Sequence, residues 1–65
     1  MYLLKDIEKV KIINQSQLSA MIGISKGTLN RIFNRKQKCS KLIAYAITKT
    51  INDNAEIEDY FERVR

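Results

Sequence analysis

Residues 15–32 have the sequence QSQLSAMIGISKGTLNRI, in which Gly23 separates two short amphipathic segments. In the first segment, Leu18 and Ile22 form an apolar pair four residues apart, which is the spacing of one face of a helix. Gly23 follows directly and supplies the left-handed backbone conformation that commonly ends a helix. The pattern predicts a helix over residues 15–21 that stops at this glycine.

The helical pattern restarts after the glycine. Ser25 is a favourable N-cap for a helix from residue 26 to about residue 34. The apolar residues of that helix are Leu29, Ile32 and Phe33. Two helices that cross at a steep angle need a small residue where they touch, and Ser19 meets this need. The spacing is that of a helix-turn-helix.

Apolar periodicity predicts further helices on both sides of this motif. A first helix is expected from about Leu3 to Ile12, because Leu3, Ile7 and Val10 recur at spacings of three and four. Residues 35–39 have no apolar periodicity and predict a basic loop. Ser40 then caps a fourth helix. Its broad apolar stripe consists of Leu42, Ile43, Ala46, Ile47 and Ile51.

The C-terminal segment, residues 54–65, predicts a last helix. Asp53 and Glu56 have the spacing of a capping box before it. The segment is also our candidate dimerisation element, through the apolar residues Ile57, Tyr60, Phe61 and Val64. The alternative is that these residues only close a small monomer core. The fold class expected for residues 1–65 is all-α: one compact domain of about five short helices.

The basic residues concentrate in the middle of the chain. The whole sequence has a formal net charge of +5. Residues 26–50 contain seven Lys and Arg residues and no Asp or Glu, whereas residues 51–65 have a net negative charge. A segment of this kind is expected to face a polyanion such as nucleic acid. The alternative is a solvated face whose charges confer only solubility.

The composition excludes most enzyme mechanisms. The sequence has no histidine and one cysteine, Cys39, so it lacks a ligand set for zinc and a pair for nucleophilic catalysis. We expect no catalytic residue, no metal, no cofactor and no small-molecule substrate. A lone cysteine cannot form an internal disulfide, and no signal segment opens the chain, so a cytoplasmic location is expected. No apolar run is long enough to span a membrane.

At the level of sequence, the motif resembles the phage-repressor and Cro-like helix-turn-helix family, the XRE family. The resemblance runs from about residue 13 to residue 51. The residues that carry it are Gln15, Leu18, Gly23, Ser25 and Ile32. Two residues of the loop after the second helix depart from the family pattern: Arg35 and Cys39 stand where glycine and then proline are common. Asn34 is the expected left-handed residue in place of that glycine.

The resemblance implies roles for individual residues. The candidates for contacting base edges in the major groove are Lys26, Gly27, Thr28, Asn30 and Arg31. The candidates for contacting phosphates are Gln15, Asn34, Arg35, Lys36, Lys38, Ser40 and Lys41. Gln15 matches a position that either contacts a phosphate or braces the recognition helix.

The resemblance also implies a function. It points to a sequence-specific double-stranded DNA-binding repressor of phage or mobile-element genes in bacteria, acting by promoter occlusion because no further domain is expected. A homodimer on DNA is expected, because one recognition helix contacts only a few base pairs. Two alternatives remain open. One is a protein-interaction module, such as an anti-repressor or antitoxin, that binds an antagonist or partner protein; the other is a DNA-bending recombination accessory factor.

Overall fold

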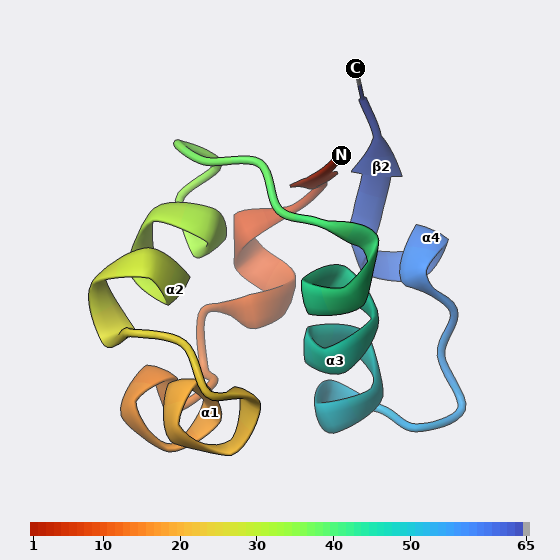
Figure 1. The fold of residues 1–65 in the computed structure, drawn as a ribbon. Helices are drawn as coiled ribbons and strands as arrows, with labels where there is room; N and C mark the ends of the chain where they lie inside the picture. Colours follow the sequence, from red (N-terminus) through yellow and green to blue (C-terminus); the bar gives the residue numbers. More distant parts are fainter. Residues whose placement is uncertain (65) are drawn as a thin grey trace.

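A computed structural model of the chain describes residues 1–64. Four α-helices and one 3₁₀ helix lie between two short strands that pair with each other (Figure 1). In chain order the elements are β1 (Tyr2–Leu4), the 3₁₀ helix Ile7–Val10, α1 (Gln15–Ile22), α2 (Lys26–Phe33), α3 (Lys41–Ile51), α4 (Ile57–Tyr60) and β2 (Phe61–Arg63).

The three central helices begin at the residues that the sequence predicts. The side chains of Asn14, Ser25 and Ser40 each accept a hydrogen bond from a backbone N–H in the first turn of α1, α2 and α3, respectively. These bonds satisfy amides that would otherwise lack a partner at a helix start. Gly23 ends α1 with a φ of 89°, in the left-handed region. The predicted helix-turn-helix is therefore confirmed.

The core lies where α1, α2 and α3 meet the two strands. Ser19, the expected small contact residue, is buried, and its hydroxyl donates to the carbonyl of Ser16 over 3.0 Å. The apolar residues Leu18, Leu29 and Ile32 are buried beside it, as the motif requires. Packing of these three side chains fixes the angle between α1 and α2, and so the direction in which α2 faces solvent.

The prediction of a helix from Leu3 to Ile12 is wrong. Tyr2 and Leu4 are both buried, which is the alternation of a strand, and β1 pairs antiparallel with β2. Asp6 ends the extended segment, since its side chain accepts from the N–H of Glu8 over 3.0 Å and starts the 3₁₀ helix. A short isolated helix is marginal, so pairing with a distant strand prevails over the local pattern.

The predicted helix over residues 54–65 is much shorter. Only α4 is helical, and the chain then turns into β2; Arg65 lies outside the described residues. The capping interaction also lies three residues later than expected, because the N–H of Glu56 donates to Asp59 Oδ2 over 2.8 Å. Phe61 is fully buried. It lies in β2 opposite Leu4, so its side chain reaches the core from a strand and not from a helix.

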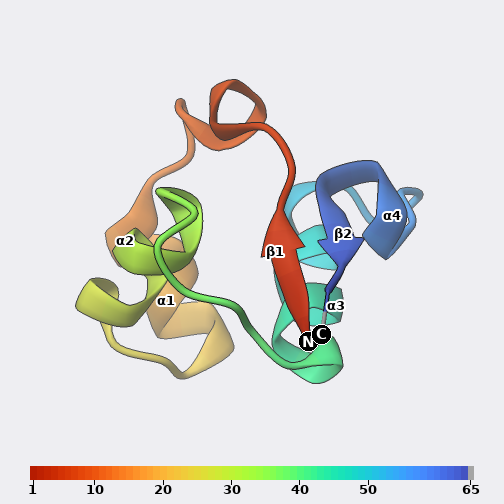
Figure 2. The same cartoon turned by 90° about the horizontal axis from the view of Figure 1, so that it is seen from above.

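β1 has neighbours on both sides, as Figure 2 shows. On one side its partner is β2, in a register that places Leu3 opposite Glu62. On the other side Tyr2 forms an isolated bridge with Cys39, in the loop between α2 and α3. The small sheet thus ties the two ends of the chain to this loop. The fold class is mostly helical, with a two-stranded sheet that the all-α prediction lacked.

Candidate nucleic-acid interface

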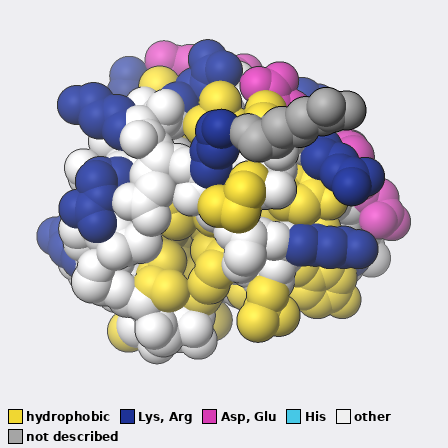
Figure 3. All heavy atoms as spheres, turned by 45° about the horizontal axis from the view of Figure 1, so that its top comes forward, with side chains coloured by type: hydrophobic (Ala, Val, Ile, Leu, Met, Phe, Trp, Pro, Cys, Tyr) yellow, Lys and Arg dark blue, Asp and Glu magenta, His cyan; other side chains and the backbone are white. Residues whose placement is uncertain are grey.

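The exposed side of α2 and the loop that follows it form a cationic surface. Figure 3 shows Lys and Arg side chains on the left of the molecule, where α2 lies, with no Asp or Glu beside them. Asp and Glu side chains lie towards the top and right margins, together with further Lys and Arg side chains. The described acids belong to the N-terminal segment and to residues 53–62. Residues 26–41, which form α2, the loop after it and the first residue of α3, contribute cations and no acid, which favours binding of a polyanion to the α2 side.

The candidate base-contacting residues do occupy one helix, α2. Lys26, Gly27 and Arg31 are exposed, and Thr28 is half-buried. A Cβ on Gly27 would lie 3.7 Å from Arg31 Nη1, so the guanidinium of Arg31 passes over the glycine at ordinary contact distance. Arg31 and Thr28 lie one turn apart, and their side chains meet on the solvent face.

Two hydrogen bonds hold the Arg31 guanidinium. Its Nε donates to Gln37 Oε1 over 2.9 Å, and its Nη2 donates to Thr28 Oγ1 over 3.2 Å. Thr28 Oγ1 also lies 2.8 Å from the hydroxyl of Ser25, the N-cap of α2. Arg31 is thus part of a network on the helix surface, which restricts the directions in which it can donate to a ligand.

Gln15 and Asn30 connect α1 with α2. Asn30 Nδ2 donates to Gln15 Oε1 over 3.2 Å. Of the two roles considered for Gln15, this contact corresponds to bracing of the recognition helix. The bond also turns the Asn30 amide towards α1, whereas Arg31 and Thr28 interact with each other and with Gln37.

The left-handed residue after α2 is Arg35 and not Asn34. Asn34 has a φ of −97°, whereas Arg35 has a φ of 60°. The N–H of Lys36 donates to the carbonyl of Arg31 over 2.9 Å, and the N–H of Arg35 donates to that of Ile32 over 3.2 Å. These two bonds form a Schellman motif, in which the residue after the C-cap must be left-handed. Arg35 thus takes the conformation of the family's glycine.

Cys39 anchors the other end of this loop. Its N–H donates to the carbonyl of Tyr2, and its carbonyl accepts from the N–H of Tyr2, each over 2.8 Å. A proline at this position could not donate the first bond. Cys39 is buried, and burial raises the pKa of its thiol from 9.0 to about 11, partly offset by the positive N-terminus. The thiol is therefore a packing group and not an activated nucleophile.

Apart from Gln15 in α1, the candidate phosphate-contacting residues lie between the end of α2 and the start of α3. Lys36, Lys38, Ser40 and Lys41 are all exposed. Ser40 accepts from the N–H of Ile43 over 3.3 Å, as the N-cap of α3. Asn34 Nδ2 donates to the carbonyl of Asn30 over 2.8 Å, and Arg35 Nη2 lies 3.7 Å from Glu62 Oε1. Asn34 and Arg35 thus both interact within the chain.

The candidate dimer-interface residues split into two pairs. Phe61 and Ile57 are buried in the core, with 0% and 7% of their surface exposed. Their side chains are therefore not available to a second copy, and for these two residues the interface prediction is wrong. Tyr60 and Val64 are only partly buried and stay candidates.

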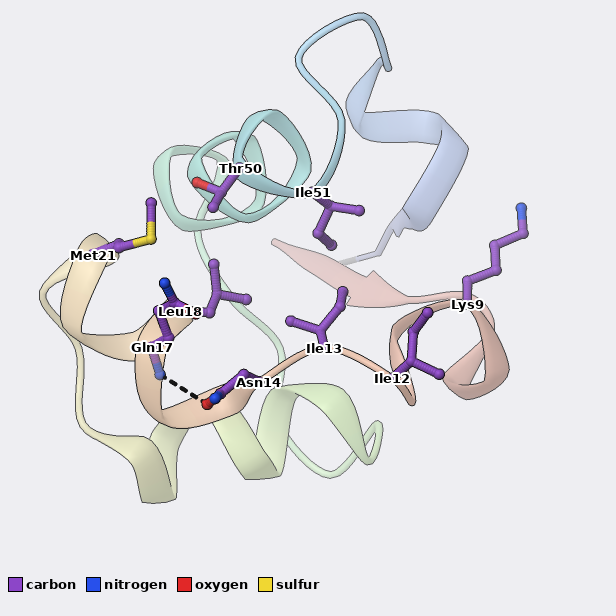
Figure 4. A pocket seen from close by; sticks show the side chains of 9 residues that line it. All are labelled: Lys9, Ile12, Ile13, Asn14, Gln17, Leu18, Met21, Thr50 and Ile51. Atoms are coloured by element: carbon purple, nitrogen blue, oxygen red, sulfur yellow. Dashed lines mark hydrogen bonds between the residues drawn. The ribbon is translucent and has the colours of Figure 1, made fainter.

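A groove of about 420 Å³ lies between α1, the C-terminal end of α3 and the segment before α1 (Figure 4). Ile13, Leu18 and Ile51 line it, and the rim includes Ile12 and Met21, whose exposed fractions are 95% and 66%. No residue of α2 lines the groove, so it is separate from the cationic surface. Within residues 1–64, no group of His, Cys, Asp or Glu side chains is placed to hold a metal ion, and no helix is long and apolar enough to cross a membrane.

Gln37 is the residue of this surface that sequence analysis missed. It stands between two lysines in a loop without periodicity, and no spacing rule places its amide on Arg31. The contact depends on the backward turn at Arg35, where a non-glycine residue takes a left-handed conformation. Side chains of this kind become visible only when the path of the loop is known.

The fold and this surface define the class of the protein, a helix-turn-helix DNA-binding domain. The family model described as helix-turn-helix matches residues 11–52, more than half of the chain, and the chain belongs to that family. The match confirms the resemblance to the XRE family, and the protein is a DNA-binding transcription regulator of this type. A search of the curated proteins found no match to the chain.

Proposed function

We propose that the protein is a sequence-specific repressor that occupies promoter DNA through α2. The observation that carries this proposal is the network around Arg31, because a guanidinium held by two hydrogen bonds on an exposed helix suits directed contact with a base. Thr28 offers a hydroxyl and a methyl group on the same face, and the methyl suits contact with a thymine methyl.

The phosphate contacts in this proposal come from the two sides of α2. Lys36, Lys38 and Lys41 follow α2 in the anchored loop and the first turn of α3, where they neutralise one strand of the backbone. Gln15 lies at the start of α1, where free backbone N–H groups also favour a phosphate. These contacts set the position of α2 in the major groove and contribute affinity for any sequence.

A homodimer on a two-fold symmetric operator is part of the proposal. One α2 helix covers only a few base pairs, so two copies on half-sites about 34 Å apart give useful specificity. Tyr60 and Val64 are the remaining interface candidates of the C-terminal segment. On α3, Leu42 and Tyr45 expose 76% and 51% of their surface and add apolar area of the kind that a dimer interface needs.

Binding to a library of genomic DNA fragments tests the proposal. The chain and its Arg31→Ala variant are each incubated with the library at two salt concentrations, and the bound fragments are sequenced. We expect a short palindromic motif for the chain, lost in the variant, with affinity falling steeply as salt rises. Lys36→Ala serves as the control, since loss of one phosphate contact weakens binding to all sequences alike.

The other outcomes identify the alternative functions. Salt-sensitive binding without a motif contradicts a repressor and favours an accessory factor, which bending of a DNA fragment then reveals. Absence of DNA binding favours a protein-interaction module. A motif without internal symmetry contradicts the dimer alone and leaves sequence-specific binding intact.

A further inference from the structure

We infer that Gln37 is a positioning residue. It holds Arg31 on the α2 surface so that the guanidinium donates to guanine through Nη1 and Nη2, its terminal nitrogens. The inference rests on the proposed function, because it assumes that α2 contacts bases. Gln37 is half-buried and its Oε1 lies 2.9 Å from Arg31 Nε. An amide that is partly buried and accepts from a charged donor orients that donor more firmly than solvent does.

The direction of contact follows from the donors that remain. Gln37 accepts a hydrogen bond from Nε of Arg31, and Thr28 accepts one from Nη2. Nη1 and the second N–H of Nη2 are left to donate, and together they present two parallel N–H bonds at the end of the side chain. Two such donors match the O6 and N7 acceptors that guanine presents in the major groove. Without the hydrogen bond to Gln37, the Nε–H of Arg31 would also be available to donate to a base.

The backbone explains why this chain can place an amide there. The left-handed Arg35 turns the chain back after α2, and the bridge between Cys39 and Tyr2 fixes the far end of the loop. Gln37 lies between these two fixed points, so its side chain returns to Arg31, six residues earlier. Arg35 keeps the turn that the family's glycine makes, and Cys39 adds a backbone N–H that proline lacks, so both ends of the loop are fixed around Gln37.

The test compares base preference position by position. An operator is first selected from random double-stranded DNA with the unchanged chain, and dissociation constants are measured for every single-base-pair variant of it by fluorescence anisotropy. Arg31→Ala identifies the base pair that Arg31 contacts, as the position where discrimination is lost. Gln37→Met, which keeps the length of the side chain but lacks the amide, is then measured at that position.

We expect Gln37→Met to reduce discrimination at the Arg31 position by about fivefold or more, with affinity for random DNA unchanged. Gln37→Glu keeps an acceptor for Nε, so it should retain the preference while its negative charge weakens binding to all sequences alike. Thermal unfolding midpoints that match the unchanged chain exclude a general loss of structure as the cause.

Three results would overturn the inference. Unchanged preference at the Arg31 position in Gln37→Met shows that the amide does not position Arg31, while the proposed function stands. A further loss of preference when Gln37→Met is added to Arg31→Ala shows that Gln37 contacts a base itself. If the unchanged chain selects no motif, the proposed function fails and the inference falls with it.

Discussion

The backbones of Tyr2 and Cys39 exchange two hydrogen bonds of 2.8 Å, one in each direction. This bridge joins the N-terminal strand to the loop that follows the recognition helix. β1 in turn pairs with β2, so the cationic loop is anchored on the same small sheet that buries Phe61. The loop geometry at the candidate DNA interface therefore depends on both ends of the chain.

Replacement of Cys39 tests this dependence. Cys39→Pro removes the N–H that donates to Tyr2 and leaves a carbonyl in the bridge unpaired, so we expect a loss of about 1–3 kcal/mol in the free energy of unfolding beyond that of Cys39→Ala. Urea denaturation of both variants measures the difference. Cys39→Ala is the matched control because it removes the thiol and keeps both backbone bonds. Equal stability of the two variants would show that the bridge contributes nothing.

Arg35 pays a conformational cost for the turn after α2. A non-glycine residue in the left-handed region costs about 1–2 kcal/mol, so Arg35→Gly should stabilise the fold by somewhat less, about 0.5–1 kcal/mol, because glycine also has more freedom when unfolded. Its exposed pair with Glu62 contributes little. Thermal unfolding checks the sign. Lys36→Gly is the control, because it also removes one positive charge but at a position without positive φ. If Lys36→Gly raised the unfolding midpoint as well, relief of backbone strain would not explain the effect.

Gly27 and Gly23 are expected to respond in opposite ways to alanine. Gly27 lies in α2, and a Cβ there would make an ordinary contact with Arg31 Nη1 at 3.7 Å, so Gly27→Ala should stabilise the fold by up to about 1 kcal/mol. Gly23→Ala places alanine at a φ of 89° and should destabilise by about 1 kcal/mol or more. Denaturation measures both. Unchanged DNA affinity of Gly27→Ala would show that the backbone does not approach DNA closely at this position and that the added methyl leaves Arg31 in place.

Local signals made the central part of the fold predictable from sequence. Three helices start at N-cap residues that bond within four residues along the chain: Asn14, Ser25 and Ser40. Gly23 ends one of these helices in the same local way. None of these signals depends on distant parts of the chain. The α2 surface could be predicted for the same reason, since spacing along one helix places Thr28 beside Arg31.

The ends of the chain were not predictable in this way. β1 exists because residues 2–4 meet residues 61–63, and neither segment alone distinguishes a strand from a short helix by its apolar spacing. The contact between Gln37 and Arg31 could not be predicted for a related reason. This contact needs a left-handed arginine and a bridge from Cys39 to the N-terminal strand, and both depend on tertiary structure.

Phe61 is expected to matter for folding and not for association. Its side chain is fully buried, so Phe61→Ala should cost about 3–5 kcal/mol, enough to unfold most of a small domain. Circular dichroism at several protein concentrations distinguishes the two roles. Loss of helicity at every concentration is the expected result, and a folded monomer would return Phe61 to the candidate interface. Val64→Ala, at a half-buried position, is the control and should remain folded.

The Cys39 thiol provides a pH-dependent test of burial. With its pKa raised to about 11 from 9.0, the folded protein at pH 8 holds about a hundredfold less thiolate than an exposed cysteine, so alkylation by iodoacetamide should be slower by at least that factor.

The raised pKa means that the folded state retains the proton more strongly. Its stabilising contribution is therefore complete below about pH 9 and is lost as pH rises towards 11. Stability measured across this range in the chain and in Cys39→Ser, which does not titrate there, isolates the effect. Parallel curves for the two proteins would contradict burial of the thiol, and with it the tight packing of the loop against β1.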